Sequence, residues 1–220
     1  MTNPAASTYT PPPRDCDRCP RLHGFIAGHR VRFPDWHNAP VPSFGSLSAR
    51  LAIVGLAPGL RGANRTGRPF TGDHAGDLLY GTLLKFGLAR GTFAARPDDG
   101  LELLDCRIAN AVRCVPPENK PTPAEFTACR PFLVEELAAM PDLRVIVALG
   151  KGSHDQVLRA LAVKPAAAYP FVHGRQHVLP SGTMLADSYH CSRYNTNTRR
   201  LTEAMFHDVF RDVVARLAEG

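Results

Sequence analysis

The sequence predicts an α/β protein, a three-layer α/β/α sandwich with a central, mostly parallel four-stranded sheet. Two observations carry this prediction: short apolar runs typical of buried strands, and segments of helical apolar spacing that alternate with them along the chain. Such alternation favours parallel strands covered by helices on both faces of the sheet. The length of 220 residues fits one domain with a substantial core.

The first half of the chain supplies two strands and a helix. The run 51–54 consists of Leu, Ala, Ile and Val and stops at Gly55, so it is predicted as the first strand. Leucines and a phenylalanine at helical spacing predict a helix over 76–86, which Gly87 ends. The apolar run 107–112 is predicted as the second strand.

The second half continues the alternation. A Thr-Pro-Ala-Glu sequence opens a helix over 122–140, because it combines a capping box with proline at the first helical position. The runs 144–149 and 184–189 are predicted as the third and fourth strands, separated by a helix over 151–161. Apolar residues at helical spacing over 201–217 predict a terminal amphipathic helix.

The N-terminal segment differs from the rest of the chain. Residues 1–15 are rich in proline and are predicted to form a flexible arm, whereas residues 16–220 form a single domain. Residues 20–48 are expected to wrap irregularly around that domain. The N-terminus lacks the basic and apolar regions of a secretory signal, and no apolar run is long enough to span a membrane. We therefore expect a cytoplasmic protein.

Basic residues outnumber acidic ones, and the formal net charge is +6. This excess is compatible with a polyanionic partner but does not require one. The arginines include two groups in loops, Arg61, Arg65 and Arg68 in the first and Arg193, Arg199 and Arg200 in the second. Basic side chains on loops suit a surface that follows phosphate groups. Ordinary solvated loop charges are an equal alternative for each of them.

Four of the six cysteines form a pattern typical of a metal centre. Cys16 and Cys19 are a Cys-x-x-Cys pair, whereas Cys114 and Cys129 stand alone much further along the chain. Four such thiolates could bind a soft metal centre and tie the N-terminal arm to the middle of the domain. Structural zinc sites more often use two close pairs, so the spacing leaves zinc and an iron–sulfur cluster both open. Disulfides are disfavoured, because a chain of this size without a secretory signal does not need them.

Polar side chains gather where the predicted strands end, which is where ligands bind in open α/β sheets. The first strand leads into Gly-Leu-Ala-Pro-Gly at 55–59 and then into Asn-Arg-Thr-Gly-Arg-Pro-Phe-Thr-Gly-Asp at 64–73. The second leads to Asn110 and, further on, Asn119, and the fourth leads into Ser-Tyr-His-Cys-Ser-Arg-Tyr-Asn at 188–195. One aromatic ring, one carboxylate, one imidazole and several amides would form a small pocket suited to a flat heterocycle.

These stretches resemble those of uracil-DNA glycosylases of the iron–sulfur branch, and specifically family 5, the UDGb type. The resemblance is carried by 55–59, by 64–73, by 113–123 and by 188–196, and it extends from Cys16 to the terminal helix. It implies hydrolysis of the N-glycosidic bond of uracil in double-stranded DNA, which leaves an abasic site. It also implies activity on deaminated purines such as hypoxanthine and xanthine, by a monomer that acts on the nucleoid of a prokaryotic cell.

The resemblance also implies a cofactor and a set of ligands for it. The family holds a [4Fe–4S] cluster on four cysteines, which here fall on Cys16, Cys19, Cys114 and Cys129. The resemblance, and not the spacing, therefore favours iron–sulfur over zinc. The cluster is interpreted as a structural group and not as a redox catalyst.

The reaction itself suggests roles for three side chains. An enzyme that acts on a base in a duplex must flip the nucleotide out, and Phe70 is expected to stack on it; a plain core position is its alternative. His190 can donate to a base carbonyl oxygen as negative charge builds on the leaving base. The Asp73 carboxylate can stabilise the oxocarbenium-like sugar and orient the attacking water. Its alternative is to cap the helix that follows.

The remaining expected contacts come from the same motifs. The expected base-binding residues are Gly55, Ala57, Phe70, Asn110, Asn119 and Asn195, and the expected DNA-backbone contacts are Ser192 and Arg193. Related families have a polar residue in place of Leu56 or Ala57. In this chain, either water activation comes from elsewhere, which favours Asp73, or the bond breaks with little help at the water. Asn110 is the residue type with which family 4 reads the pyrimidine edge, and it favours uracil over purines.

The two remaining cysteines are not among the expected site residues. Cys106 lies in a strand-like run and is expected to be an inert core thiol, whereas Cys191 has no assigned role. Lyase activity is not expected, because no lysine in these motifs is an obvious Schiff-base former; Lys120, beside Asn119, is the nearest exception. Two other classes stay open: an iron–sulfur or zinc protein that binds nucleic acid without catalysis, and a cluster-bearing redox protein. The second would explain the cysteines but not Phe70, Asp73 and His190.

Overall fold

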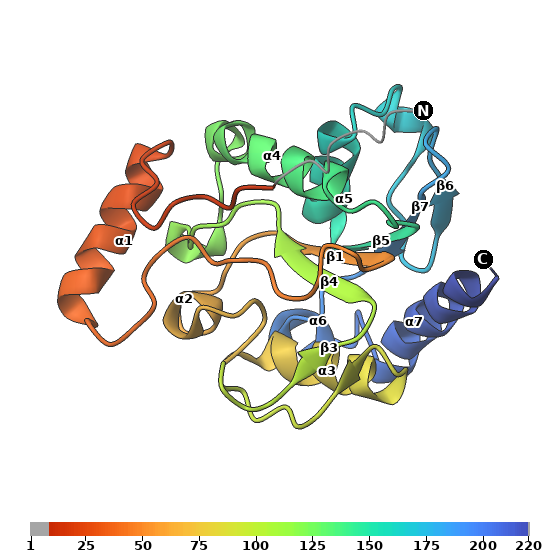
Figure 1. Cartoon of the computed structure of the whole chain (residues 1–220), viewed down its shortest axis with the longest axis horizontal. Helices are drawn as coiled ribbons and strands as arrows, with labels where there is room; N and C mark the ends of the chain where they lie inside the picture. The colour runs from red at the N-terminus through yellow and green to blue at the C-terminus, as the bar shows by residue number, and fades with distance from the viewer. Residues whose placement is uncertain (1–8, 220) are drawn as a thin grey trace.

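The protein is built on a five-stranded sheet in the order β4–β1–β5–β7–β6, with helices on both faces (Figure 1). The computed structural model describes residues 9–219. Four strands are mutually parallel: β1 (Leu51–Gly55), β4 (Cys106–Asn110), β5 (Val145–Leu149) and β7 (Met184–Ser188). These four strands and the α/β class confirm the sequence prediction.

The predicted strand count of four is wrong by one. The fifth strand, β6 (Gln176–Val178), pairs antiparallel with the edge of β7. Its two outer residues are exposed and only the middle one is partly buried. A strand of three residues without an apolar run gives no periodic signal, which explains why the sequence did not reveal it.

Helices cover the sheet on two sides, as expected for a three-layer sandwich (Figure 1). On one face, α4 (Pro123–Ala138) and α5 (Lys151–Ala160) bury apolar side chains against alternate strand residues. On the other face, α3 (His74–Lys85) and α7 (Glu203–Ala218) do the same. All four helices were predicted. The side chains of Asp73, Thr122 and Thr202 cap α3, α4 and α7, and Gly150 precedes α5. The capping box of α4 is present, with Thr122 N donating to Glu125 Oε2 at 2.7 Å.

The expectation of irregular chain over 20–48 is wrong for its first part, which forms α1 (Pro20–Arg32). Only Leu22 and Ile26 of this helix are buried, so its apolar periodicity is too weak to be seen in the sequence. Residues 1–8 of the predicted flexible arm lie outside the described residues. The part of the arm next to α1 is held by Arg30, whose Nη2 donates to the Arg14 carbonyl at 2.9 Å.

Short elements complete the fold. These are the α-helical turns α2 (Ala63–Thr66) and α6 (Arg193–Asn197), the 3₁₀ turns η1 (Pro117–Asn119) and η2 (Ala166–Ala168), and a hairpin of β2 (Ala89–Arg90) and β3 (Glu102–Leu103). Across residues 9–219, none of the helices combines the length and the apolar character needed to cross a bilayer.

A buried ionic network ties β4 and the loop after it to α4. Arg113 is 1% exposed and donates to the carboxylate of Glu136, which is equally buried. Arg107, on β4, donates to the other oxygen of Glu136 at 2.6 Å. The loop that leaves β4 is therefore fixed to the helix behind it before it reaches the cavity described next.

Candidate active site

A cavity of about 810 Å³ lies at the carboxyl ends of β1, β4 and β7 and at the start of α3. This is the edge of the sheet at which the sequence predicts a ligand site. Eight of the ten predicted catalytic, base-binding and DNA-contacting residues line it: Ala57, Phe70, Asp73, Asn110, Asn119, His190, Ser192 and Arg193. The structure thus brings together motifs that are separated by more than half of the chain.

The floor of the cavity is formed where the first two parallel strands end side by side. Gly55 on β1 pairs in register with Asn110 on β4. A side chain at position 55 would collide with Asn110 Oδ1 and would stand 2.7 Å from Phe70 Cζ, so only glycine fits between them. Gly55 is therefore a spacer beneath the cavity and not one of the residues that line it.

Asn110 presents a polar group that the rest of the described chain leaves unused. Its side chain is 3% exposed, and Oδ1 has no hydrogen-bond partner among the described residues. Buried polar atoms are almost always paired, so an unpaired one beside a cavity indicates a ligand that completes it. A carboxamide offers both a donor and an acceptor, which matches the edge of a nucleobase.

Phe70 belongs both to the hydrophobic core and to the cavity wall. It is 7% exposed and packs with the core cluster of the α3 and α7 face, yet its ring also lines the cavity. The ring centroid lies 5.8 Å from that of His190. The backbone of Phe70 has φ of +52°, a conformation that costs about 1–3 kcal/mol for a residue with a side chain. Phe70 therefore has the core position that the sequence left open as its alternative, and its ring also lines the cavity, where stacking on a base stays a prediction.

Asp73 likewise combines a structural position with a place in the cavity lining. It is the N-cap of α3, and its Oδ1 accepts a hydrogen bond from Gly76 N at 3.3 Å. Its Oδ2 lies so close to Gly62 that a side chain there would collide with it. Burial raises the pKa of Asp73 above its ordinary value, against the opposing effect of the amides of Gly76 and Ala75. Asp73 is the one carboxylate among the described residues that line the cavity.

His190 follows the last residue of β7 by two positions and faces the same cavity. Burial alone lowers the pKa of its imidazole to about 4, so the ring is neutral at neutral pH. A neutral imidazole still has one N–H to donate. Asn195 does not line the cavity. Its Nδ2 donates to the His190 carbonyl at 2.8 Å, and it therefore holds the His190 loop in place.

The rim of the cavity is polar and basic. Ser192 caps α6, and Arg193 and Arg61 extend from exposed positions. Asn119 is exposed at the end of η1 and has φ of +56°. Lys120 is exposed and pairs with Glu118 at 3.3 Å, outside the cavity lining.

One basic residue and one lining residue differ from expectation. Arg68 does not follow phosphate groups, because it is 5% exposed and forms an ion pair with Asp99. His74 lines the cavity, although the sequence analysis did not assign it a role. Its Nε2 lies 3.1 Å from Thr196 Oγ1, so it links the start of α3 to α6. Its position directly after the capping Asp73 was the signal that could have identified it.

The four cysteines of the predicted metal centre also meet in the structure. Cys16, Cys19, Cys114 and Cys129 line one small cavity between the start of α1, the loop after β4 and α4. All are free thiols. In residues 9–219, however, no group of three or more His, Cys, Asp or Glu side chains has the arrangement that would hold a metal ion.

The surroundings of these thiols change their pKa values. Burial, reinforced by the neighbouring thiols, raises the pKa of Cys19 to about 11 and raises that of Cys114 further. The backbone N–H of Arg113 donates to Cys129 Sγ at 3.3 Å. These raised pKa values favour the protonated thiols, and a positively charged centre would be needed to bind the four cysteines together as thiolates. The donor set therefore fits a soft, thiolate-bound group.

The fold and the cavity define an α/β protein with a site for a flat heterocyclic ligand that carries hydrogen-bonding edges. Comparison with known families identifies it further. A family model described as the uracil DNA glycosylase superfamily matches residues 42–214. The chain therefore belongs to the uracil-DNA glycosylase superfamily.

Curated relatives refine this assignment. The chain is 44% identical to the type-5 uracil-DNA glycosylase of Thermus thermophilus, over 90% of this chain and 91% of the relative. It is 43% identical to the type-5 enzyme of Mycobacterium leprae, over 90% and 89% of the two chains. The type-5 enzyme of Pyrobaculum aerophilum is 40% identical, over 91% and 88%. The resemblance to family 5 that the motifs indicated is thus confirmed.

The low pKa of His190 predicts a specific pH response. An unfolded histidine takes up a proton near pH 6.5, whereas the folded one resists protonation until about pH 4. As the pH falls through this window the unfolded state binds more protons, so the free energy of unfolding decreases. The difference in this free energy between the wild type and His190→Gln should therefore change between pH 6.5 and pH 4, in the direction that disfavours the wild type. Urea unfolding at each pH measures it, and a difference that stays constant over this window would contradict the assignment.

Proposed function

We propose that the protein is a uracil-DNA glycosylase of base excision repair, which flips uracil out of double-stranded DNA, hydrolyses its N-glycosidic bond and leaves an abasic site. The observation that carries this proposal is the convergence of Phe70, Asn110, Asp73 and His190 on one cavity. The names of the type-5 relatives support the same activity. We further propose that it acts as a monomer in the cytoplasm, on the DNA of the nucleoid.

Recognition of the base uses the floor and one wall of the cavity. Phe70 offers a ring face on which a flipped base can stack, and the Asn110 carboxamide can pair with the edge of uracil. Ala57 lines the cavity with an apolar group and leaves room beside the base. Ser192, Arg193 and Arg61 on the rim would contact the phosphate groups that flank the flipped nucleotide.

Bond cleavage separates charge, and two of the ionisable groups that line the cavity, His190 and Asp73, match the two ends of the breaking bond. The leaving base becomes negative, and the neutral imidazole of His190 can donate a hydrogen bond to its carbonyl oxygen. The sugar becomes positive, and the Asp73 carboxylate can stabilise it and orient water for attack. Leu56 and Ala57 in the first loop are apolar, so neither offers an alternative base for the water.

The range of substrates follows from cavity size and from Asn110. A cavity of about 810 Å³ has room for a purine as well as for a pyrimidine. We therefore propose that deaminated purines such as hypoxanthine and xanthine are also released. We propose that Asn110, whose carboxamide can pair with the carbonyl and the N–H of a pyrimidine edge, favours uracil among them.

The four cysteines are proposed to hold a [4Fe–4S] cluster. Cysteine sulfur is a soft donor that fits such a group, and the positive charge of the iron would stabilise the four cysteines as thiolates. Asn110 ends β4 and Cys114 lies in the loop that follows it, whereas Cys16 and Cys19 precede α1. The bound cluster would therefore fix the Asn110 loop and anchor α1, without taking part in the reaction.

The first test of the proposed function is base release from duplex oligonucleotides that contain uracil, detected by alkaline cleavage of the abasic product. Asp73→Asn should lower the single-turnover rate by about 10²- to 10⁴-fold, because it removes the charge that faces the sugar and the water. Binding to the same duplex should survive the substitution. Wild-type protein that binds the duplex but releases no uracil would contradict the proposal and indicate a binding protein without catalysis.

Asn110 provides a second test, which concerns the choice of base. Asn110→Ala should reduce the ratio of uracil release to hypoxanthine release by about tenfold, because a lost hydrogen bond in a buried site costs on the order of 1–3 kcal/mol. Arg193→Ala serves as a matched control. It should slow the release of both bases equally, since a phosphate contact carries no base preference. An unchanged ratio in Asn110→Ala would exclude Asn110 as the selective residue.

The cluster proposal is tested by composition and by stability. Protein purified without oxygen should contain iron and acid-labile sulfide in equal amounts, and Cys114→Ser should lose both and melt at a lower temperature. Cys106→Ala, which alters a buried thiol outside this cavity, should retain them. Zinc in place of iron would contradict the assignment. Retained uracil release after loss of the cluster would contradict its role in holding the site.

A further inference from the structure

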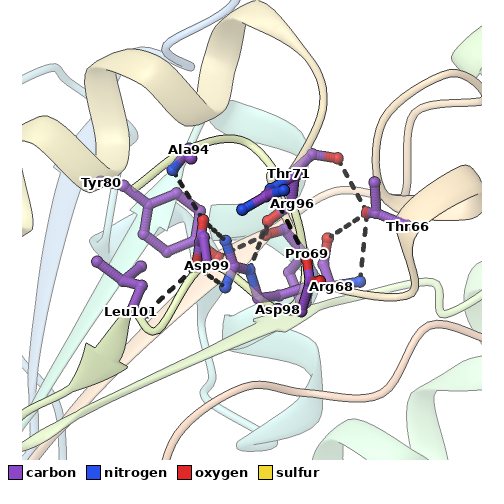
Figure 2. A network of polar contacts seen from close by, with 10 residues as sticks. All are labelled: Thr66, Arg68, Pro69, Thr71, Tyr80, Ala94, Arg96, Asp98, Asp99 and Leu101. Atoms are coloured by element: carbon purple, nitrogen blue, oxygen red, sulfur yellow. Dashed lines mark hydrogen bonds and ion pairs between the residues drawn. The ribbon is translucent and has the colours of Figure 1, made fainter. Parts of the chain in front are cut away.

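A buried ion pair lies behind the cavity, between Arg68 and Asp99 (Figure 2). Nη1 and Nη2 of Arg68 each donate to one carboxylate oxygen of Asp99 at 2.8 Å. The two side chains are 6% and 0% exposed. This two-pronged geometry is the strongest form of such a contact, and it lowers the pKa of Asp99 far below its ordinary value. Burying two charges is costly in itself, so stability alone is a weak reason for the pair to exist.

Arg68 is fixed on every side. Its third donor, Nε, reaches Thr71 Oγ1 at 2.8 Å. The guanidinium also lies over the rings of Phe44 and Tyr80, at 5.2 and 5.3 Å from their centroids. Such contacts between a cation and an aromatic face are favourable when both are removed from water. Arg68 is therefore held in one position by Asp99 together with Thr71 and the two rings.

Asp99 in turn organises the long loop between β2 and β3. Its Oδ2 accepts a hydrogen bond from Ala94 N at 2.9 Å, and its Oδ1 accepts one from Leu101 N at 3.1 Å (Figure 2). The carboxylate thus joins both ends of this loop to Arg68. The loop contributes no residue to the lining of the cavity.

The other end of this network holds the turn that contains Phe70. The Pro69 carbonyl accepts hydrogen bonds from the Tyr80 hydroxyl at 2.6 Å and from Thr71 Oγ1 at 3.2 Å (Figure 2). Thr66 Oγ1 donates to the Thr71 carbonyl at 3.0 Å. The backbone on both sides of Phe70 is therefore held by hydrogen bonds. A left-handed backbone at a residue with a side chain persists only where the surroundings over-determine it, and these contacts do so.

We propose that Asp99 is a positioning residue for base stacking. Through Arg68 and Thr71 it holds Phe70 in its left-handed conformation, so that the ring stays against Gly55 and Asn110 and faces the cavity. The inference rests on the proposed function, because it assumes that a flipped base stacks on Phe70. A stacking surface must be held to within a fraction of an ångström, and contacts behind the site supply that precision.

The test uses a double-mutant cycle on uracil release. Asp99→Asn keeps the size of the side chain and removes its charge. It should reduce the single-turnover rate by about a hundredfold at most, the loss that a displacement of about 1 Å can cause, while the affinity for the duplex is unchanged. In a Phe70→Ala background the same substitution should have no further effect, because the ring it positions is already absent. Glu102→Gln breaks an exposed ion pair on the same hairpin and should change nothing.

A spectroscopic measurement separates this inference from the proposed activity. With 4-fluorophenylalanine placed at position 70, the ¹⁹F resonance should shift or split in Asp99→Asn and should be unchanged in Glu102→Gln. If Asp99→Asn does not fold, Tyr80→Phe removes one hydrogen bond to the Pro69 carbonyl, keeps the ring and should also shift the resonance. Equal rate losses in both backgrounds, or an unchanged resonance, would overturn the positioning role. A wild type without base release would overturn the proposed function, while the resonance would still decide on Asp99.

Discussion

The buried contact between Arg113 and Glu136 is the interaction on which the arrangement of both cavities depends. Arg113 lies in the loop after β4, between Asn110 in the candidate active site and Cys114 in the thiol cavity. Glu136 also accepts from Arg107 on β4, so one helical carboxylate orients both the strand and the loop that leaves it. Loss of Glu136 would leave the buried Arg113 guanidinium without a carboxylate to neutralise it, which is among the most destabilising changes a core can undergo.

The end of β4 and the loop after it therefore border both the candidate active site and the thiol cavity. Asn110, the last residue of β4, stands directly before this loop and supplies the carboxamide at the cavity floor. Within the loop, the backbone N–H of Arg113 donates to Cys129 Sγ on α4. The Arg113 carbonyl accepts from Val41 N at 2.7 Å, so the segment before β1 is fixed to the same loop. The chain between Asn110 and Cys114 therefore connects the floor of the candidate active site directly to the thiol cavity. The apolar residues packed around Cys114 and Cys129 also contact Ala57 and Leu60, which line the candidate active site, so a bound cluster could affect the site by this route as well.

The sequence predicts the parts of the fold that have strong local signals. Buried strands such as 145–149 and the capping box before α4 were identified, because apolar runs and caps act within a few residues. Helix α1 and strand β6 were missed, because each buries too little to show a period. For the site, the rule that ligands bind at strand ends placed Asn110 and His190 correctly. The burial of Arg68 could not be predicted, since its partner Asp99 lies in a loop that no local pattern connects to it.

Phe70 is a core residue and Asp73 a helix cap, and both also line the cavity. This combination has a physical reason. Both residues lie where an element begins or turns beneath the cavity, and such positions have backbone groups that need partners. Asp73 satisfies one of them with Oδ1, while the same carboxylate faces the cavity. An Asp73→Ala substitution therefore combines the loss of a helix cap, about 0.5–2 kcal/mol of stability, with the loss of a charge at the site. The first effect changes the folded fraction and the second changes the rate per folded molecule, so the two can be separated only when both quantities are measured.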